Sequence, residues 1–203
     1  MDISQTPNTL PRAKRGSNFE YDAKYYGKIG EDDLVSLLQP SDKTVEIINV
    51  GNNENFFDYD IDIIQMTLPG YTIDNVLDLL RKNSIQKIPF AHTYEVKTDT
   101  RSVDTRNIVY EILSHDNPGC LAKSKAEFIY YVFLDREDNI AERYILNLKE
   151  WRRWLREHSD DCNKSTFLRT FNFNRTNDKC FNFLCNIEKL VEDHVAKKIV
   201  LSE

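Results

Sequence analysis

The segment Thr93 to Asp99 is an extended, β-prone run that carries an acid and a lysine two positions apart. Because the side chains of a strand alternate between its two faces, Glu95 and Lys97 emerge on the same face. A second acidic run, Asp60-Ile-Asp62-Ile-Ile, comes earlier in the chain and also has a strand-like pattern. Carboxylates on neighbouring strands can hold a hard divalent cation, and a lysine beside them can orient a water or stabilise negative charge. The two segments together are typical of a sheet that carries a metal-assisted hydrolytic site.

The rest of the chain predicts strands followed by helices rather than strict alternation of the two. β-branched, aromatic or alternating runs predict strands at 44–50, 57–66, 92–98, 108–113, 128–134 and 141–146. Apolar periodicity predicts helices at 19–38, 73–81, 148–158 and 178–200. This order favours an α/β fold with a central mixed β-sheet flanked by helices. The length of 203 residues fits one domain at 18–203 after a polar tail at 1–17, with an insertion at about 67–90 and a helical C-terminal region at about 148–203.

Further motifs stand in order around the two acidic segments. They are Tyr26-Gly-Lys-Ile-Gly-Glu31 on a helix, the Asp60–Asp62 strand, the Glu95-Val-Lys97 strand, Asn107–Glu111, Pro118-Gly119 and Ser124–Phe133. This order resembles the PD-(D/E)xK nuclease superfamily, in particular its phage and viral members, over about residues 19–157. The chain departs from that pattern because no Pro precedes either candidate Asp and because a longer insertion precedes Glu95.

The resemblance implies a restriction-endonuclease-like fold and a nuclease that hydrolyses DNA with Mg²⁺ or Mn²⁺, in viral or mobile-element DNA processing. The implied metal ligands are the carboxylates of Asp62 or Asp60 and of Glu95, together with the backbone carbonyl of Val96. Lys97 would position the attacking water and stabilise the pentacovalent phosphorane. Glu31 would add an outer contact to the metal site or contact a second metal ion.

Two choices among the acids stay open at this stage. Asp58, Asp60 and Asp62 share one face if their strand is regular. We favour Asp62 as the metal ligand because two aliphatic residues follow it directly, where the strand would enter the core, and Asp60 is the alternative. Glu31 stands beside two further acids, and acids near a helix N-terminus are also favoured by the helix dipole alone.

The net charge of −6 argues against a strong non-specific binder of nucleic acid, because a protein that contacts many phosphates usually has a basic surface. The charge is unevenly spread, however, so one face can still bind DNA. The candidate DNA-binding residues are Lys123, Lys125, Arg152, Arg153 and Arg156. For the three arginines, simple solvation of a helix face is an equally good interpretation.

Further features of the sequence concern the cellular compartment and the state of the cysteines. The chain has no run of about 18 apolar residues that would span a membrane, and its first residues lack the pattern of a secretory signal. Its four cysteines lack C-x-x-C spacing, which indicates reduced thiols rather than disulfides or a zinc site. We therefore expect a protein of the cytoplasm, or of the host cell or virion interior if it is viral, that is not secreted.

Two other functions stay open. A catalytically inactive protein of the same fold would act as a DNA- or protein-binding module, although the intact Asp and Glu-x-Lys set argues against it. A ribonuclease would carry the same residues, because nothing in them reports on a 2′-hydroxyl.

A homodimer would suit double-strand cleavage, although the chain shows no coiled-coil heptads.

Overall fold

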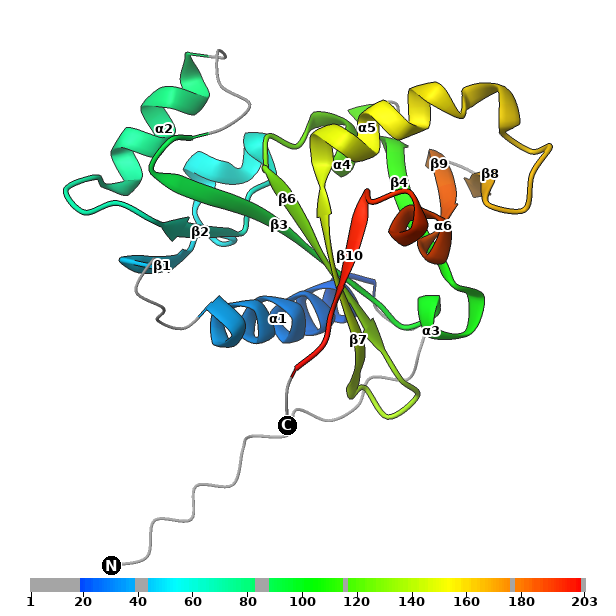
Figure 1. Cartoon of the computed structure of the whole chain (residues 1–203), viewed down its shortest axis with the longest axis horizontal. Coiled ribbons are helices and arrows are strands. Elements are labelled where there is room, and N and C mark those ends of the chain that lie inside the picture. Colours follow the sequence, from blue (N-terminus) through cyan, green and yellow to red (C-terminus); the bar gives the residue numbers. More distant parts are fainter. Residues whose placement is uncertain (1–18, 39–43, 83–87, 115–116, 176–177, 202–203) are drawn as a thin grey trace, which may run out of the picture.

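The structure is a computed structural model that describes residues 19–38, 44–82, 88–114, 117–175 and 178–201 (Figure 1). The predicted tail at 1–17 lies outside the described residues. The helices are α1 (Phe19–Leu38), the 3-10 helix η1 (Glu54–Tyr59), α2 (Ile73–Arg81), α3 (Ser102–Thr105), α4 (Cys120–Lys123), α5 (Leu148–Glu157), the 3-10 helix η2 (Ser159–Asp161) and α6 (Ile187–Glu192). The strands are β1 (Glu46–Asn49), β2 (Ile63–Met66), β3 (Ala91–Asp99), β4 (Asn107–Ser114), β5 (Asn117–Pro118), β6 (Phe128–Leu134), β7 (Ile140–Asn147), β8 (Leu168–Arg175), β9 (Asp178–Asn186) and β10 (Ala196–Ile199).

Six of the strands form one mixed sheet with the order β1-β2-β3-β6-β7-β10. Strands β3 and β6 pair in parallel, and the other neighbours in this sheet pair antiparallel. A second, antiparallel sheet has the order β5-β4-β9-β8. The predicted α/β fold with a mixed sheet flanked by helices is confirmed.

Helix α1 packs against β3 on one face of the mixed sheet and lies below β1, β2 and the start of β3 in Figure 1. Leu34 of α1 packs there in a buried cluster with Ile63 of β2, Val96 of β3 and Tyr130 of β6. The next residue of β2, Ile64, belongs to a separate cluster that includes η1 and α2. Because neighbouring strand residues point to opposite faces, η1 and α2 cover the other face of the β1–β3 half.

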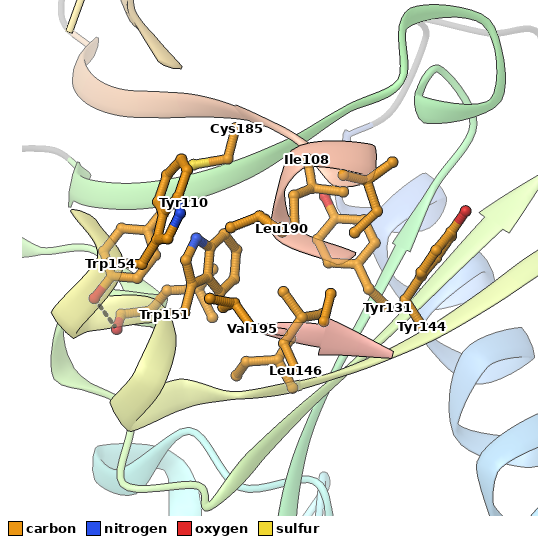
Figure 2. Packing of buried hydrophobic residues seen from close by; sticks show 14 of the residues in the cluster. Ile108, Tyr110, Tyr131, Tyr144, Leu146, Trp151, Trp154, Cys185, Leu190 and Val195 are labelled. Carbon is orange, nitrogen blue, oxygen red and sulfur yellow. Dashed lines mark hydrogen bonds between the residues drawn. The ribbon is translucent and has the colours of Figure 1, made fainter. Parts of the chain in front are cut away.

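Helices α5 and α6 and the second sheet cover the β6–β7 part of that same face. Trp151 of α5 is fully buried and makes an edge contact with the ring of Tyr110 on β4. Leu146 of β7 and Leu190 of α6 belong to the same cluster, which Figure 2 shows from close by. The second sheet is thus joined to the first through one apolar core.

Helix α1 approaches β3 closely at Gly30. A Cβ atom at Gly30 would lie 2.4 Å from Thr98 Oγ1 and 2.7 Å from Val96 Cγ1, both inside van der Waals contact. The two neighbours are β-branched residues with restricted χ1 rotation, so they cannot easily move away. The missing side chain at Gly30 therefore lets α1 lie directly on the strand that carries Glu95 and Lys97.

We expect Gly30→Ala to lower the free energy of unfolding by about 1–3 kcal/mol, the usual cost of overpacking a core. Gly27→Ala is the matched control in the same helix, because, apart from its chain neighbours and the nearby backbone of its own helix, no atom of the described residues lies within 4 Å of its Cβ position. The higher helix propensity of Ala predicts a gain of up to about 1 kcal/mol at that control position. Urea unfolding measures both variants, and equal stabilities would contradict the close packing of α1 on β3.

The predicted strand at 57–66 is only partly present. Residues up to Tyr59 form η1, Asp60 follows in the left-handed region with φ 45°, and β2 begins only at Ile63. Phe56 is fully buried on the α2 side, and this packing, rather than alternation, decides the local conformation. The shared strand face predicted for the acids at 58, 60 and 62 is therefore wrong.

The predicted helix at 178–200 is wrong, and so is a mainly helical region at 148–203. The segment forms strand β9, the short helix α6 and strand β10. β9 pairs with β4 on one side and with β8 on the other, which satisfies its backbone groups on both edges. The side chain of Asn186 then caps α6 by accepting a hydrogen bond from the Lys189 N–H.

Most of the other predictions for local structure are confirmed. Helices appear at 19–38, 73–81 and 148–157, and the strands around 46–49, 91–99, 107–114, 128–134 and 140–147 match their predicted segments. Cys162 and Cys185 carry free thiols, as expected. No described helix is both long and apolar enough to cross a membrane.

Candidate active site

Strands β2 and β3 separate at Asp62. The Asp62 N–H donates to the Tyr94 carbonyl at 2.8 Å, and strand pairing begins at the next residue, Ile63. The left-handed turn at Asp60 leads the preceding chain away from β3. At this point the Asp62 carboxylate takes the place of a backbone partner for β3, since its Oδ2 accepts a hydrogen bond of 2.8 Å from the Val96 N–H. The N–H and the carbonyl of one strand residue point to the same edge of the strand. The Val96 carbonyl therefore also points to the edge of β3 where Asp62 lies.

Glu95 is a buried acid on β3 with 4% of its surface exposed. Its Oε1 forms an ion pair with Lys97 Nζ, so the two side chains lie on the same strand face, as predicted. Burial, together with the charges of Asp62 and Asp60, raises the pKa of Glu95 to about 8, although Lys97 lowers it. Lys97 therefore offsets only part of the cost of placing a carboxylate here.

Glu31 reaches the same region from α1. Its Oε2 accepts a hydrogen bond of 2.7 Å from the Asn49 side chain. Its Oε1 and Asp62 Oδ1 both lie 3.3 Å from the point where a Cβ at Gly51 would stand. Burial raises the pKa of Glu31, and the negative charge of Asp62 raises it further. The glycine that follows β1 thus leaves space in which two acids from different elements meet.

The structure distinguishes the three consecutive acids of α1. Asp33 accepts two hydrogen bonds of 2.9 Å from Arg143 on β7, and it also accepts one from the Tyr130 hydroxyl on β6. This clasp ties α1 to the sheet. Asp32 pairs at the surface with Lys28, one turn earlier in the helix. Of the three, Glu31 is the acid that lies beside Asp62.

Asp60 lies close to the other acids but points to a different partner. Its Oδ1 is 3.4 Å from Lys123 Nζ at the end of α4, and its carbonyl accepts a 3.0 Å hydrogen bond from the Ser124 hydroxyl. Its buried Oδ2 receives no hydrogen bond from the described residues. Burial raises the pKa of Asp60, while Lys123 and Lys97 lower it and Asp62 raises it. Asp62 therefore faces the β3 edge, and Asp60 faces α4.

The residues present fit a divalent cation in their chemistry. Within the described ranges, no group of three or more His, Cys, Asp or Glu side chains is already arranged to hold a metal ion. Even so, burial raises the pKa of all four neighbouring carboxyls, at Glu31, Asp60, Asp62 and Glu95, so a cation among them would offset a real cost. Carboxylate and carbonyl oxygens, without His or Cys, suit Mg²⁺ or Mn²⁺. Lys97 pairs with Oε1 of Glu95, so the second carboxylate oxygen of Glu95 would be the one to bind a metal ion.

The candidate DNA-binding residues differ in their exposure and in the contacts that they make within the fold. Lys123 and Lys125 are exposed and flank Ser124 beside Asp60. Arg152 is instead bound into the fold, where its Nη2 donates to the carbonyls of Leu121 at 2.7 Å and Ser124 at 2.8 Å. Its Nε donates to the Tyr110 hydroxyl at 3.1 Å. Arg152 therefore holds the turn between α4 and β6, which is a structural task.

The other two arginines of α5 lie at the surface. Arg153 pairs with Glu150 and Glu157 of its own helix, and Arg156 is exposed. These ion pairs support the interpretation of a solvated helix face. Sequence reasoning missed Asn49 and Gly51, although the Asn-Val-Gly run directly after a β-branched segment is a usable signal for a turn near the acids.

Comparison of the chain with protein-family models, with curated proteins and with solved structures finds no match. The case for function consequently depends on the geometry of this site and on the order of its motifs.

Proposed function

We propose that the protein is a Mg²⁺- or Mn²⁺-dependent deoxyribonuclease of the restriction-endonuclease-like type. One observation carries this proposal, namely the 2.8 Å hydrogen bond from the Val96 N–H to Asp62 Oδ2. It holds an acid from the start of β2 against the middle of the Glu95-Val-Lys97 run. The resemblance to phage and viral nucleases extends the proposal to the processing of viral or mobile-element DNA.

Asp62, Glu95 and the Val96 carbonyl would hold the metal ion. When bound, the metal supplies Lewis-acid stabilisation of the phosphate and lowers the pKa of a bound water. Asp60 pairs with Lys123, and Glu31 accepts a hydrogen bond from Asn49. Both acids would influence the metal site from outside the set of metal ligands. The protein contributes a fixed position for each acid, because each is hydrogen-bonded or paired before substrate arrives.

Lys97 would act on the attacking water and on the phosphate. Its side chain is 29% exposed, so its ammonium group can reach solvent and substrate while its stem stays packed. The ammonium N–H groups of Lys97 would donate hydrogen bonds to the attacking water. The positive charge of Lys97 would then stabilise the negative charge that develops on phosphorus oxygens.

A specific observation favours a second function. Lys97 pairs with Glu95 and Lys123 pairs with Asp60, so two of the four acids are neutralised by the protein itself. A DNA-binding protein that does not cut would benefit from such pairs, because they limit repulsion of the phosphates. If the protein is such a binding module, it should form stable DNA complexes whose affinity does not depend on Mg²⁺.

The test of the nuclease is its dependence on metal. Purified protein is expected to nick supercoiled plasmid with Mg²⁺ or Mn²⁺ and to stop when EDTA removes the ion, because the buried acids need a cation to act together. Conversion of supercoiled to open-circular DNA on a gel measures the rate. Equal cutting in EDTA would rule out the metal mechanism, and binding without cutting of duplex, branched or single-stranded DNA would favour the binding module.

A further inference from the structure

An exposed phenylalanine lies in the short helix that precedes the acids of the candidate active site. Phe57 lies in η1 with 52% of its surface exposed, three residues before Asp60. Asp60 follows directly after the end of η1, so Phe57 stands in the short helix that leads into the acidic turn. A single exposed aromatic is common on proteins, so its surroundings decide what it means.

The backbone around Phe57 is held from both sides. Its neighbour Phe56 is fully buried and anchors η1 in the core. The Tyr59 carbonyl accepts a 2.8 Å hydrogen bond from the Lys125 N–H, and the Asp60 carbonyl accepts one from the Ser124 hydroxyl. The end of η1 and the turn after α4 are thus one connected unit. An aromatic ring on such a support needs little ordering when it binds a flat ligand.

The charged side chains on η1 and around the turn after α4 favour different positions for the base and the phosphate of a nucleotide. Lys123 ends α4, Lys125 stands on the turn after it, and both are exposed. The exposed acids Glu54 and Asp58 stand on η1 itself, on either side of Phe57. The acids repel phosphate from η1, whereas the lysines attract it to the neighbouring turn. A nucleic acid strand that satisfies both has its backbone on the lysines and a base over the phenylalanine.

We propose that Phe57 stacks on an unpaired base while Lys123 and Lys125 bind the phosphates of the same strand. A base inside a duplex cannot reach the ring without leaving its stack, so the ligand is single-stranded DNA. Combined with the proposed nuclease activity, on which this last step rests, the preferred substrate carries an unpaired nucleotide next to the cut. Stacking on aromatic side chains is tolerant of base identity, so no sequence preference follows from it.

The binding test uses EDTA, so that no DNA is cut and the result does not depend on nuclease activity. Fluorescence anisotropy compares a dye-labelled oligothymidine with a duplex of equal length. Phe57→Ala should weaken single-strand binding by about 5- to 150-fold, which corresponds to one base–aromatic stack, and should leave duplex binding nearly unchanged. Phe57→Tyr should keep wild-type affinity because it retains the ring. Tyr71→Ala, which removes another exposed aromatic (45% exposed), is the matched control and should change neither.

Two further measurements separate stacking from general loss of binding. An oligonucleotide with 2-aminopurine should lose fluorescence on binding wild type, and this quenching should disappear in Phe57→Ala. Lys123→Gln and Lys125→Gln should each make the slope of log affinity against log salt concentration shallower by about 0.7, the value for one phosphate of a single strand. A Phe57→Ala variant that binds single strands as tightly as wild type would overturn the proposal, as would a wild type that binds no single strand. Cutting without any effect of Phe57 refutes the stack alone, whereas stacking without cutting refutes the nuclease alone.

Discussion

Lys97→Ala is expected to lose about 10²- to 10⁴-fold in the rate of DNA cleavage, the range for removal of a positioned acid–base group. Folding should be retained, because the Lys97 side chain is partly exposed and leaves no large buried cavity. Its removal also takes away the interaction that lowers the pKa of Glu95, so Glu95 keeps its proton to a higher pH. Single-turnover plasmid cleavage at saturating Mg²⁺ measures the loss, and thermal unfolding checks the fold.

Two variants make this result specific. Lys97→Arg keeps a positive charge beside Glu95, so it should still lower the pKa of Glu95 while recovering only part of the cleavage rate. Lys197→Ala removes an exposed lysine from β10, at the opposite edge of the mixed sheet, and should cut like wild type. Cleavage by Lys97→Ala at the wild-type rate would falsify a catalytic role and leave Glu95-Val-Lys97 as an ordinary strand face.

Asp62→Asn is expected to lose both metal affinity and cleavage by at least about 100-fold, because even outer partners of metal ligands cost 10- to 100-fold. The amide keeps the shape of the side chain, and its oxygen can still accept the hydrogen bond from the Val96 N–H. The fold should therefore persist while one negative charge disappears. Glu95→Gln should behave in the same way, since Glu95 is buried beside Asp62.

Asp60→Asn is the matched comparison, because it removes the same charge two residues away. The structure places Asp60 against Lys123 and Ser124, so its loss should act mainly on the turn after α4 and change metal affinity much less. Calorimetric titration with Mg²⁺ and plasmid cleavage report the two properties for each variant. If Asp60→Asn lost metal affinity and Asp62→Asn kept it, the assignment of the metal ligand to Asp62 would be wrong.

Local patterns along the chain are enough to predict much of the secondary structure. Alternation in Thr93 to Asp99 predicts a strand with Glu95 and Lys97 on one face, and the structure has both. The helix at 73–81 follows from its apolar periodicity and is found with the same bounds. These elements are predictable because their period and their end signals lie within a few neighbouring residues.

Long-range contacts account for the rest. The sequence gives Asp33 no role of its own beside Glu31, and its role follows from Arg143, a residue on β7 that lies 110 positions later. The run at 178–200 carries enough apolar residues for a helix, but pairing of β9 with β4 and β8 makes it a strand first. A segment's own propensity is weak compared with the burial and hydrogen bonds that distant partners provide.

The position of the acids shows the same division. The order of residues alone defines which chemical groups the site can use, namely two aspartates before β2 and a Glu-x-Lys run on β3. Packing between distant segments then turns Asp60 to Lys123 and Asp62 to the Val96 N–H. Phe56 is buried in η1 and Asp60 follows with a left-handed backbone, so the chain before β2 is not a regular strand and the two acids do not share a strand face.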